Sequence, residues 1–98
     1  MTEFELIERV FAPLAAADAA GVGLEVGDDG AVLAPPAGRD LVVVTDTMVA
    51  GRHFPKGMAP ADIGYRALAV NVSDLAAMGS EPLWFQLALT LPAIDESW

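Results

Sequence analysis

Cysteine is absent from this chain of 98 residues. Its absence excludes a disulfide framework, a thiolate zinc site and a cysteine nucleophile, and it is typical of proteins in a reducing compartment. Long apolar runs are also missing, so no segment is expected to span a membrane although 54% of the residues are hydrophobic. The first residues carry glutamate where a signal peptide would carry lysine or arginine. We therefore expect a cytoplasmic protein.

Basic residues are scarce as well. Five lysines and arginines stand against 14 aspartates and glutamates, which gives a formal net charge of −9. Such a chain repels nucleic acid, which we do not expect as a partner. It also repels a free nucleotide, so a phosphate ligand would have to bind together with divalent cations that neutralise both sides. The sequence G-x-x-x-x-G-K-[ST] is absent, which excludes P-loop binding of phosphate.

Helical signals occur at two places in the chain. A capping-box spacing from Thr2 to Glu5 precedes apolar residues at helical intervals, and it predicts a helix over 3–12. A second, longer helix is predicted over 60–78, where proline opens the pattern and Gly79 is placed as its stop. The length of the chain permits one domain at most, and a domain this small favours association with another chain.

Strand signals separate and follow these helices. Short apolar or alternating runs predict strands over 31–33, 41–44 and 83–91, and residues 92–98 resemble the first turn of a further helix. The run over 41–44 is apolar on both faces, which is typical of a buried strand. The expected fold class is α/β of the α+β type, a small mixed sheet with helices packed on one side.

Acidic residues on three different predicted elements form the most informative pattern. Asp28 and Asp29 lie in a glycine turn, Asp46 ends the strand over 41–44, and Asp74 lies on the long helix. Each has an ordinary explanation as a turn former, a strand cap or an exposed helix residue. The joint case rests on Asp46 and Asp74, because both follow apolar runs in which an unpaired charge is expensive. Converging carboxylates favour Mg²⁺, which prefers oxygen ligands and completes its shell with water or phosphate.

Two further sites in the sequence are unusual. Residues 71–74 of the long helix are mediocre helix formers between apolar turns, and Asn71 and Asp74 lie on one helical face because they are three residues apart. After the central strand the sequence predicts a turn through Gly51 that leads to His53. A lone histidine is more often a structural hydrogen-bonding residue than a catalyst, and the spacing favours the structural role.

Four segments of the chain resemble the N-terminal region of thiamine-monophosphate kinases. They are GDD at 27–29, TDTMVAGRHF at 45–54, ALAVNVSDLAAMGSEPLW at 67–84 and ALTLP at 88–92. The resemblance covers nearly the whole chain, in order and with the spacings of that family. Aminoimidazole ribonucleotide synthase and selenophosphate synthetase, related ATP-using enzymes of the same superfamily, share the fold and a looser acidic pattern. The resemblance therefore implies the N-terminal domain of the aminoimidazole ribonucleotide synthase-like superfamily.

The resemblance also implies an activity and a set of site residues. The activity is magnesium-dependent transfer of the γ-phosphoryl group of ATP to thiamine monophosphate, which gives thiamine diphosphate. The residues that match the metal ligands of the family are Asp29, Thr45, Asp46 and Asp74. Asp28 would support its neighbour, and His53 matches a position that contacts the thiamine substrate. Val44 departs from the pattern, because members of the family often carry a hydroxyl ligand there, and its backbone carbonyl would have to serve instead.

Members of this family are considerably longer than this chain. The resemblance therefore implies a single, truncated N-terminal domain over 1–98 that binds ATP and Mg²⁺, forms a homodimer through its sheet and is inactive when made alone. Two alternatives remain open at this stage. One is a non-catalytic acidic module that dimerises and binds divalent ions incidentally, and the other is a related ATP-using synthetase of the same superfamily.

Overall fold

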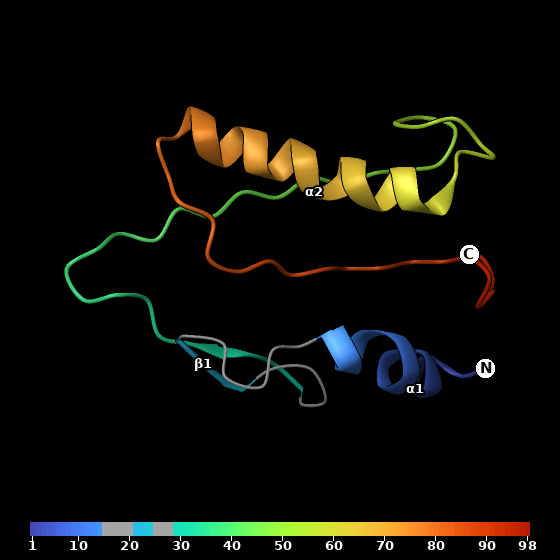
Figure 1. The fold of residues 1–98 in the computed structure, drawn as a ribbon, viewed down its shortest axis with the longest axis horizontal. Helices are drawn as coiled ribbons and strands as arrows, with labels where there is room; N and C mark the ends of the chain where they lie inside the picture. Colours follow the sequence, from blue (N-terminus) through green and yellow to red (C-terminus); the bar gives the residue numbers. More distant parts are fainter. Residues whose placement is uncertain (15–20, 25–28) are drawn as a thin grey trace. The chain divides into compact units, whose positions relative to one another are not determined.

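The computed structural model describes residues 1–14, 21–24 and 29–98 of the chain (Figure 1). These residues divide into two compact units. The first unit contains Met1–Leu41 and Leu89–Ser97, and the second contains Val42–Ala88 and Trp98. Because each unit is compact by itself, the two are described separately.

The first unit begins with a helical segment. It consists of α1 (Glu3–Leu6), the π-helical η1 (Ile7–Phe11) and the 3₁₀-helical η2 (Ala12–Leu14). The capping box is present: the Thr2 hydroxyl accepts from the Glu5 N–H at 3.2 Å, and the Glu5 carboxylate accepts from the Thr2 N–H at 2.7 Å. These two bonds satisfy backbone donors that a helix start leaves unpaired. The predicted helix over 3–12 is confirmed, although only its first four residues are α-helical.

Two short strands follow in the same unit. β1 (Val22–Leu24) and β2 (Val32–Leu33) pair antiparallel, with Val22 opposite Leu33 and Leu24 opposite Val32. The register is irregular between these two pairs. A hydrogen bond of 2.6 Å from the Ala34 N–H to the Gly21 carbonyl extends the pairing by one step. β2 confirms the strand predicted over 31–33, one residue shorter than expected.

An ion pair joins the two ends of this unit. Arg9 donates to both carboxylate oxygens of Glu96, at 2.6 Å and 3.2 Å. The two side chains are 60% and 51% exposed, so water screens their attraction. An exposed pair of this kind contributes about 1 kcal/mol at most. The ion pair therefore orients the two segments more than it stabilises them.

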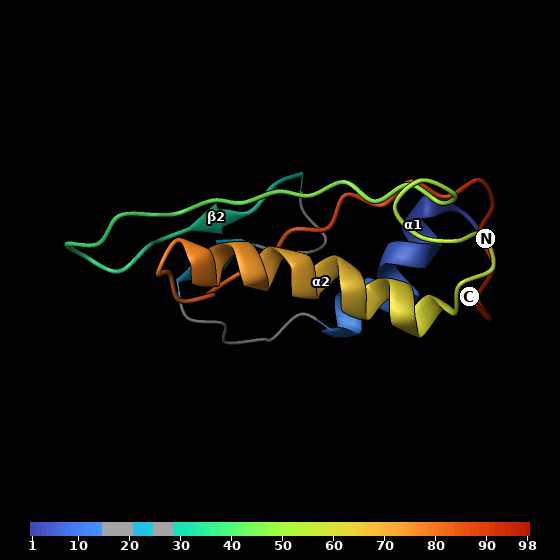
Figure 2. The ribbon, with the colours of Figure 1, turned by 90° about the horizontal axis from the view of Figure 1, so that it is seen from above.

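The second unit is dominated by α2 (Pro60–Ala77), which is uninterrupted along its length (Figure 2). Proline at its start lacks the N–H that a first turn would leave unpaired. At its end the Gly79 N–H donates to the Ala76 carbonyl at 3.0 Å and the Ser80 N–H donates to the Leu75 carbonyl at 2.9 Å. These bonds form a Schellman motif, which requires the φ of +66° that Gly79 adopts. The predicted helix over 60–78 and its stop at Gly79 are confirmed.

Three predicted elements are corrected by the structure. Residues 41–44 and 83–91 form no strand and run as plain traces (Figure 1). A strand exists only when a second strand accepts and donates its backbone hydrogen bonds, and the sheet found in the described part of the chain contains only β1 and β2. Residues 92–98 form bends and a turn instead of a helix, because the Asp95 carboxylate accepts from the N–H and the hydroxyl of Ser97 at 2.9 Å and 2.6 Å.

The helices and the small antiparallel sheet together confirm the α+β fold class. Contacts between the described elements join α1 to η1, η1 to η2 and β1 to β2. Packing of the helices on one side of the sheet therefore stays a prediction. No side chain in the described ranges is buried, so these residues contain no closed core. No helix in them is long and apolar enough to cross a membrane.

Candidate functional site

A tight turn follows the central apolar segment of the second unit. The Val49 carbonyl accepts from the N–H groups of Arg52 and His53 at 3.1 Å and 2.9 Å, and the Gly51 N–H donates to the Phe54 carbonyl at 2.7 Å. Gly51 has a φ of +79°, a conformation that favours glycine. The turn through Gly51 that the sequence predicts is confirmed, and it fixes the backbone from which His53 projects.

His53 makes a hydrogen bond within this turn through its side chain. The Val49 N–H donates to the imidazole Nδ1 at 2.9 Å. A neutral imidazole carries one N–H, so a ring that accepts at Nδ1 carries its proton at Nε2. The side chain is exposed. His53 therefore has the structural role that its spacing favours, and it also keeps a donor nitrogen that a ligand can use.

Thr45 and Asp46 precede this turn on the extended segment. Both side chains are exposed, whereas Val44 before them is half-buried. A hydroxyl and a carboxylate at adjacent exposed positions supply the oxygen ligands that Mg²⁺ prefers. The side chain of Val44 is a hydrocarbon, so only its backbone carbonyl could be a ligand from that position.

Asn71 and Asp74 lie on one face of α2. The Asn71 side-chain N–H donates to the Ala67 carbonyl at 2.8 Å, which directs the amide nitrogen back to the helix. The amide oxygen of Asn71 is then the atom that can serve a cation or a donor, and the exposed carboxylate of Asp74 lies one turn further along the same face. Ile63, Ala67 and Val70 share this face and are half-exposed. The polar pair thus interrupts an otherwise apolar surface, as the sequence predicts.

The remaining acidic candidates belong to the first unit. Asp29 is exposed and follows the strand β1, whereas Asp28 lies outside the described residues together with the glycine before it. Within the described ranges, no three aspartate, glutamate or histidine side chains are close enough to hold one metal ion. Carboxylates and a hydroxyl are ligands that suit magnesium. The assignment of Asp29, Thr45, Asp46 and Asp74 as metal ligands stays a prediction.

Lys56 is a candidate residue that the sequence pattern does not single out. Its aliphatic stem covers the open face of Gly51: a Cβ at Gly51 would lie 3.2 Å from the Lys56 Cε and 3.6 Å from its Cγ. The lysine therefore packs on the turn that holds His53. In the sequence, Lys56 could have been identified as a candidate only from its position three residues after the only histidine.

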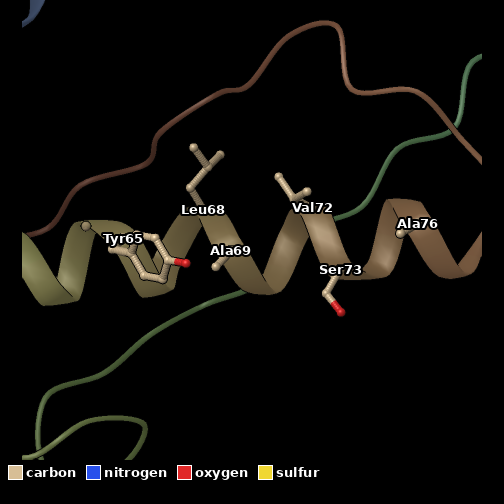
Figure 3. Close-up of a pocket in the computed structure, with 7 residues that line it drawn as sticks. Tyr65, Leu68, Ala69, Val72, Ser73 and Ala76 are labelled. Carbon is tan, nitrogen blue, oxygen red and sulfur yellow. The ribbon is translucent and has the colours of Figure 1, made fainter.

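A shallow apolar hollow runs along a second face of α2 (Figure 3). The residues that line it are Gly64, Tyr65, Leu68, Ala69, Val72, Ser73 and Ala76. Tyr65 is 79% exposed, and the lining contains no carboxylate and no cationic side chain. Helical geometry places this face on the opposite side of α2 from Asp74. The hollow is therefore not a site for a phosphate or a divalent cation.

Comparison with known proteins assigns this chain to a family and gives close relatives. The sequence profile described as AIR synthase related protein, N-terminal domain, matches residues 27–98. Thiamine-monophosphate kinase from Escherichia coli (strain K12) is 52% identical over 96 residues, which are 98% of this chain and 29% of that protein. The protein of the same name from Haemophilus influenzae is 48% identical over 98 residues, 100% of this chain and 30% of its own length.

A third relative matches part of the chain more closely. Thiamine-monophosphate kinase from Synechococcus elongatus is 56% identical over 68 residues, which are 68% of this chain and 21% of that protein. The resemblance to thiamine-monophosphate kinases that the four segments indicate is confirmed by these identities. The chain spans less than a third of the length of the curated relatives that it matches.

Proposed function

Because the chain belongs to the family of AIR synthase related proteins, as an N-terminal domain, we propose that it supplies part of the active site of a thiamine-monophosphate kinase. The observation that carries this proposal is the identity of 52% to a protein of that name over 98% of the chain. The proposed domain covers residues 1–98 and acts in the cytoplasm, in keeping with the absence of cysteine.

The proposed reaction transfers one phosphoryl group between two phosphates. The bond between the γ-phosphorus of ATP and its bridging oxygen breaks, and an oxygen of thiamine monophosphate forms the new bond to that phosphorus. The products are thiamine diphosphate and ADP. Both substrates and the transition state are polyanionic, so positioning and charge neutralisation should supply most of the rate enhancement. A chain with a net charge of −9 needs bound cations to hold the triphosphate of ATP.

The oxygen ligands of the chain define where those cations would bind. Asp29, Thr45, Asp46 and Asp74 would hold Mg²⁺, with the Val44 carbonyl as a further ligand. Bound magnesium supplies positive charge to the phosphates. The amide oxygen of Asn71, one turn from Asp74, is placed to orient a water molecule or a ligand beside that carboxylate. His53 would contact thiamine monophosphate.

A homodimer through the segment over 83–91 is part of the proposal. Phe85 and Leu87 alternate on one face of this segment and are 76% and 53% exposed. Exposed apolar side chains of this size are costly in water. A second copy of the segment would cover this face, and the two segments could pair as strands. We expect the isolated chain to have no kinase activity, since it spans 29% of its relative.

Calorimetric titration with a non-hydrolysable ATP analogue, with and without Mg²⁺, tests the metal and nucleotide assignment. We expect magnesium-dependent binding that weakens about tenfold or more in Asp46→Asn and in Asp74→Asn, because each loses a charged ligand. Asp62→Asn is the matched control, since it makes the same change at an exposed position in the first turn of α2. Unchanged affinity in the first two variants, or binding without magnesium, would contradict the assignment.

A further inference from the structure

The turn over 49–54 fixes one tautomer of the only histidine in the chain. His53 donates its backbone N–H to the Val49 carbonyl at 2.9 Å, and the Val49 N–H donates to the His53 Nδ1 at 2.9 Å. In this reciprocal pair of hydrogen bonds, the Nδ1 of His53 is the acceptor. The single proton of the neutral ring is then on Nε2, which lies on the far side of the imidazole from the turn. The ring therefore offers a donor and no acceptor to a ligand.

The same turn carries a concentration of positive charge in an acidic chain. Arg52 and Lys56 are two of only five basic residues, and both lie within three positions of His53. Residues 47–61 contain no aspartate or glutamate, although the chain has 14. The stem of Lys56 packs against the open face of Gly51, which keeps the ammonium group near the turn. Arg52 is exposed.

A donor nitrogen on a turn that also carries two cationic side chains favours an anionic ligand. Charge-assisted hydrogen bonds to phosphate oxygens are roughly twice as strong as those between neutral groups. In thiamine monophosphate the cationic thiazolium ring lies between an aminopyrimidine and an ethyl chain that ends in the phosphate, and a surface with two cations attracts the phosphate rather than the thiazolium. Sequence resemblance gives only that His53 contacts the thiamine substrate. The hydrogen bonds of the turn indicate which part of that substrate it contacts.

We propose that residues 49–56 form a phosphate-recognition turn, in which the Nε2–H of His53 donates to an oxygen of a phosphate monoester and Arg52 and Lys56 supply its counter-charge. The proposal rests on the proposed function in one respect, because it takes the monoester to be the phosphate of thiamine monophosphate. It adds the chemical group that His53 recognises, the nitrogen that it uses and two further residues.

Nitrogen-15 NMR of the 98-residue chain tests the tautomer and the ligand together. We expect the neutral ring to have an unprotonated Nδ1 and a protonated Nε2 before any ligand is added. Thiamine monophosphate and inorganic phosphate should both shift the Nε2 resonance, and thiamine should not. A non-hydrolysable ATP analogue without magnesium is the second arm, since a shift with that analogue alone would overturn the assignment to the thiamine substrate.

Two substitutions of His53 separate its structural bond from its proposed binding role. The Oδ1 of asparagine in His53→Asn lies near the position of Nδ1 and can accept from the Val49 N–H, but this variant has no counterpart of Nε2. We expect slow amide exchange at Val49 to be retained while phosphate binds roughly tenfold more weakly. His53→Ala should lose both the protection and the binding. Lys56→Gln should weaken phosphate binding to a smaller extent and reduce its salt dependence.

Three results would overturn the proposal. They are a protonated Nδ1 in the free chain, an equal response to thiamine and thiamine monophosphate, and wild-type phosphate affinity in His53→Asn. Failure of the proposed kinase function would look different. In that case Asp46→Asn and Asp74→Asn would leave magnesium-dependent nucleotide binding unchanged, while the phosphate response of His53 would persist.

Discussion

Replacement by alanine should change the stability of α2 in opposite directions at Gly64 and at Gly79. Gly64 lies inside α2, and a Cβ built on it has no neighbouring atom within 4 Å. Glycine in a helix interior is less stable than alanine by roughly 0.5–1 kcal/mol, mainly because the unfolded glycine chain has more freedom. Gly64→Ala should therefore stabilise α2 by about that amount.

Gly79 presents the opposite case. Its φ of +66° lies in the left-handed region, which costs an L-residue with a Cβ roughly 1–2 kcal/mol. The Schellman bonds from the Gly79 and Ser80 N–H groups, 3.0 Å and 2.9 Å long, depend on that conformation. No atom lies within 4 Å of a Cβ built at this position, so the whole penalty is one of backbone conformation. Gly79→Ala should destabilise the helix end, and the two variants should differ by about 2 kcal/mol.

Circular dichroism under increasing urea measures the helix content of both variants, and amide hydrogen exchange measures the cap itself. Exchange at Ser80 should accelerate in Gly79→Ala and stay unchanged in Gly64→Ala, because only the first change affects the bond to Leu75. Gly79→Asn is a graded control, since asparagine tolerates the left-handed region better than alanine does. A shift of both alanine variants in the same direction would refute the reasoning.

Two further predictions concern the helix start and the candidate site. The backbone hydrogen bond from Thr2, and after it the hydrogen bond with the Thr2 side chain, lowers the pKa of Glu5 below its ordinary value of 4.5. The contribution of the ionised Glu5 carboxylate to stability is therefore present above pH 4.5 and is lost as the pH falls through the lowered pKa. NMR titration of Glu5 checks this, and Thr2→Ala should return the pKa part of the way. Asn71→Ala should stabilise α2 by about 0.5 kcal/mol, because alanine is the better helix former, and it should weaken binding of the magnesium–nucleotide complex. Urea denaturation and calorimetry test the two effects separately, and unchanged affinity would remove Asn71 from the site.

The helices could be predicted because their signals are local. The capping box joins residues three positions apart, and the stop at Gly79 depends on the dihedral angles of one residue. Both signals can be recognised in a single stretch of sequence without knowledge of what packs beside it. For the same reason the predicted bounds of α2 differ from the structure by one residue only.

The prediction of strands over 41–44 and 83–91 was wrong because the signals for a strand are only partly local. Alternation and β-branching indicate that a segment suits a sheet, but a strand also needs a partner that is distant in the sequence or in another chain. The prediction for 92–98 failed locally, because the Asp95 side chain accepts the Ser97 N–H and competes with helix formation. An acidic residue near a helix start is favourable only when the helix forms around it.

The candidate site was predictable as a set of residue types and not as a set of bonds. Carboxylates at Asp46 and Asp74 and a turn at Gly51 follow from composition and spacing. The bond from the Val49 N–H to the His53 Nδ1 does not, because it depends on how the turn orients one backbone group. That bond fixes the tautomer of His53, so the chemistry that this residue can offer becomes visible only in the structure.

The position of Asp74 on α2 gives a physical argument for the metal assignment. Asp62 and Arg66 lie on a polar strip of the helix, where a charge contributes to solubility, whereas Asp74 shares its face with the less exposed Ile63 and Val70. Asp74 is exposed in this structure, and its carboxylate would lose hydration and need a counter-charge once a ligand or partner covers this face. If a cation supplies that charge, Asp74→Asn should leave stability unchanged or raise it without Mg²⁺, and it should lower the stabilisation that magnesium and nucleotide add. Thermal unfolding with and without both ligands measures this difference. Equal stabilisation of the variant and the wild type by the ligands would show that Asp74 carries no metal.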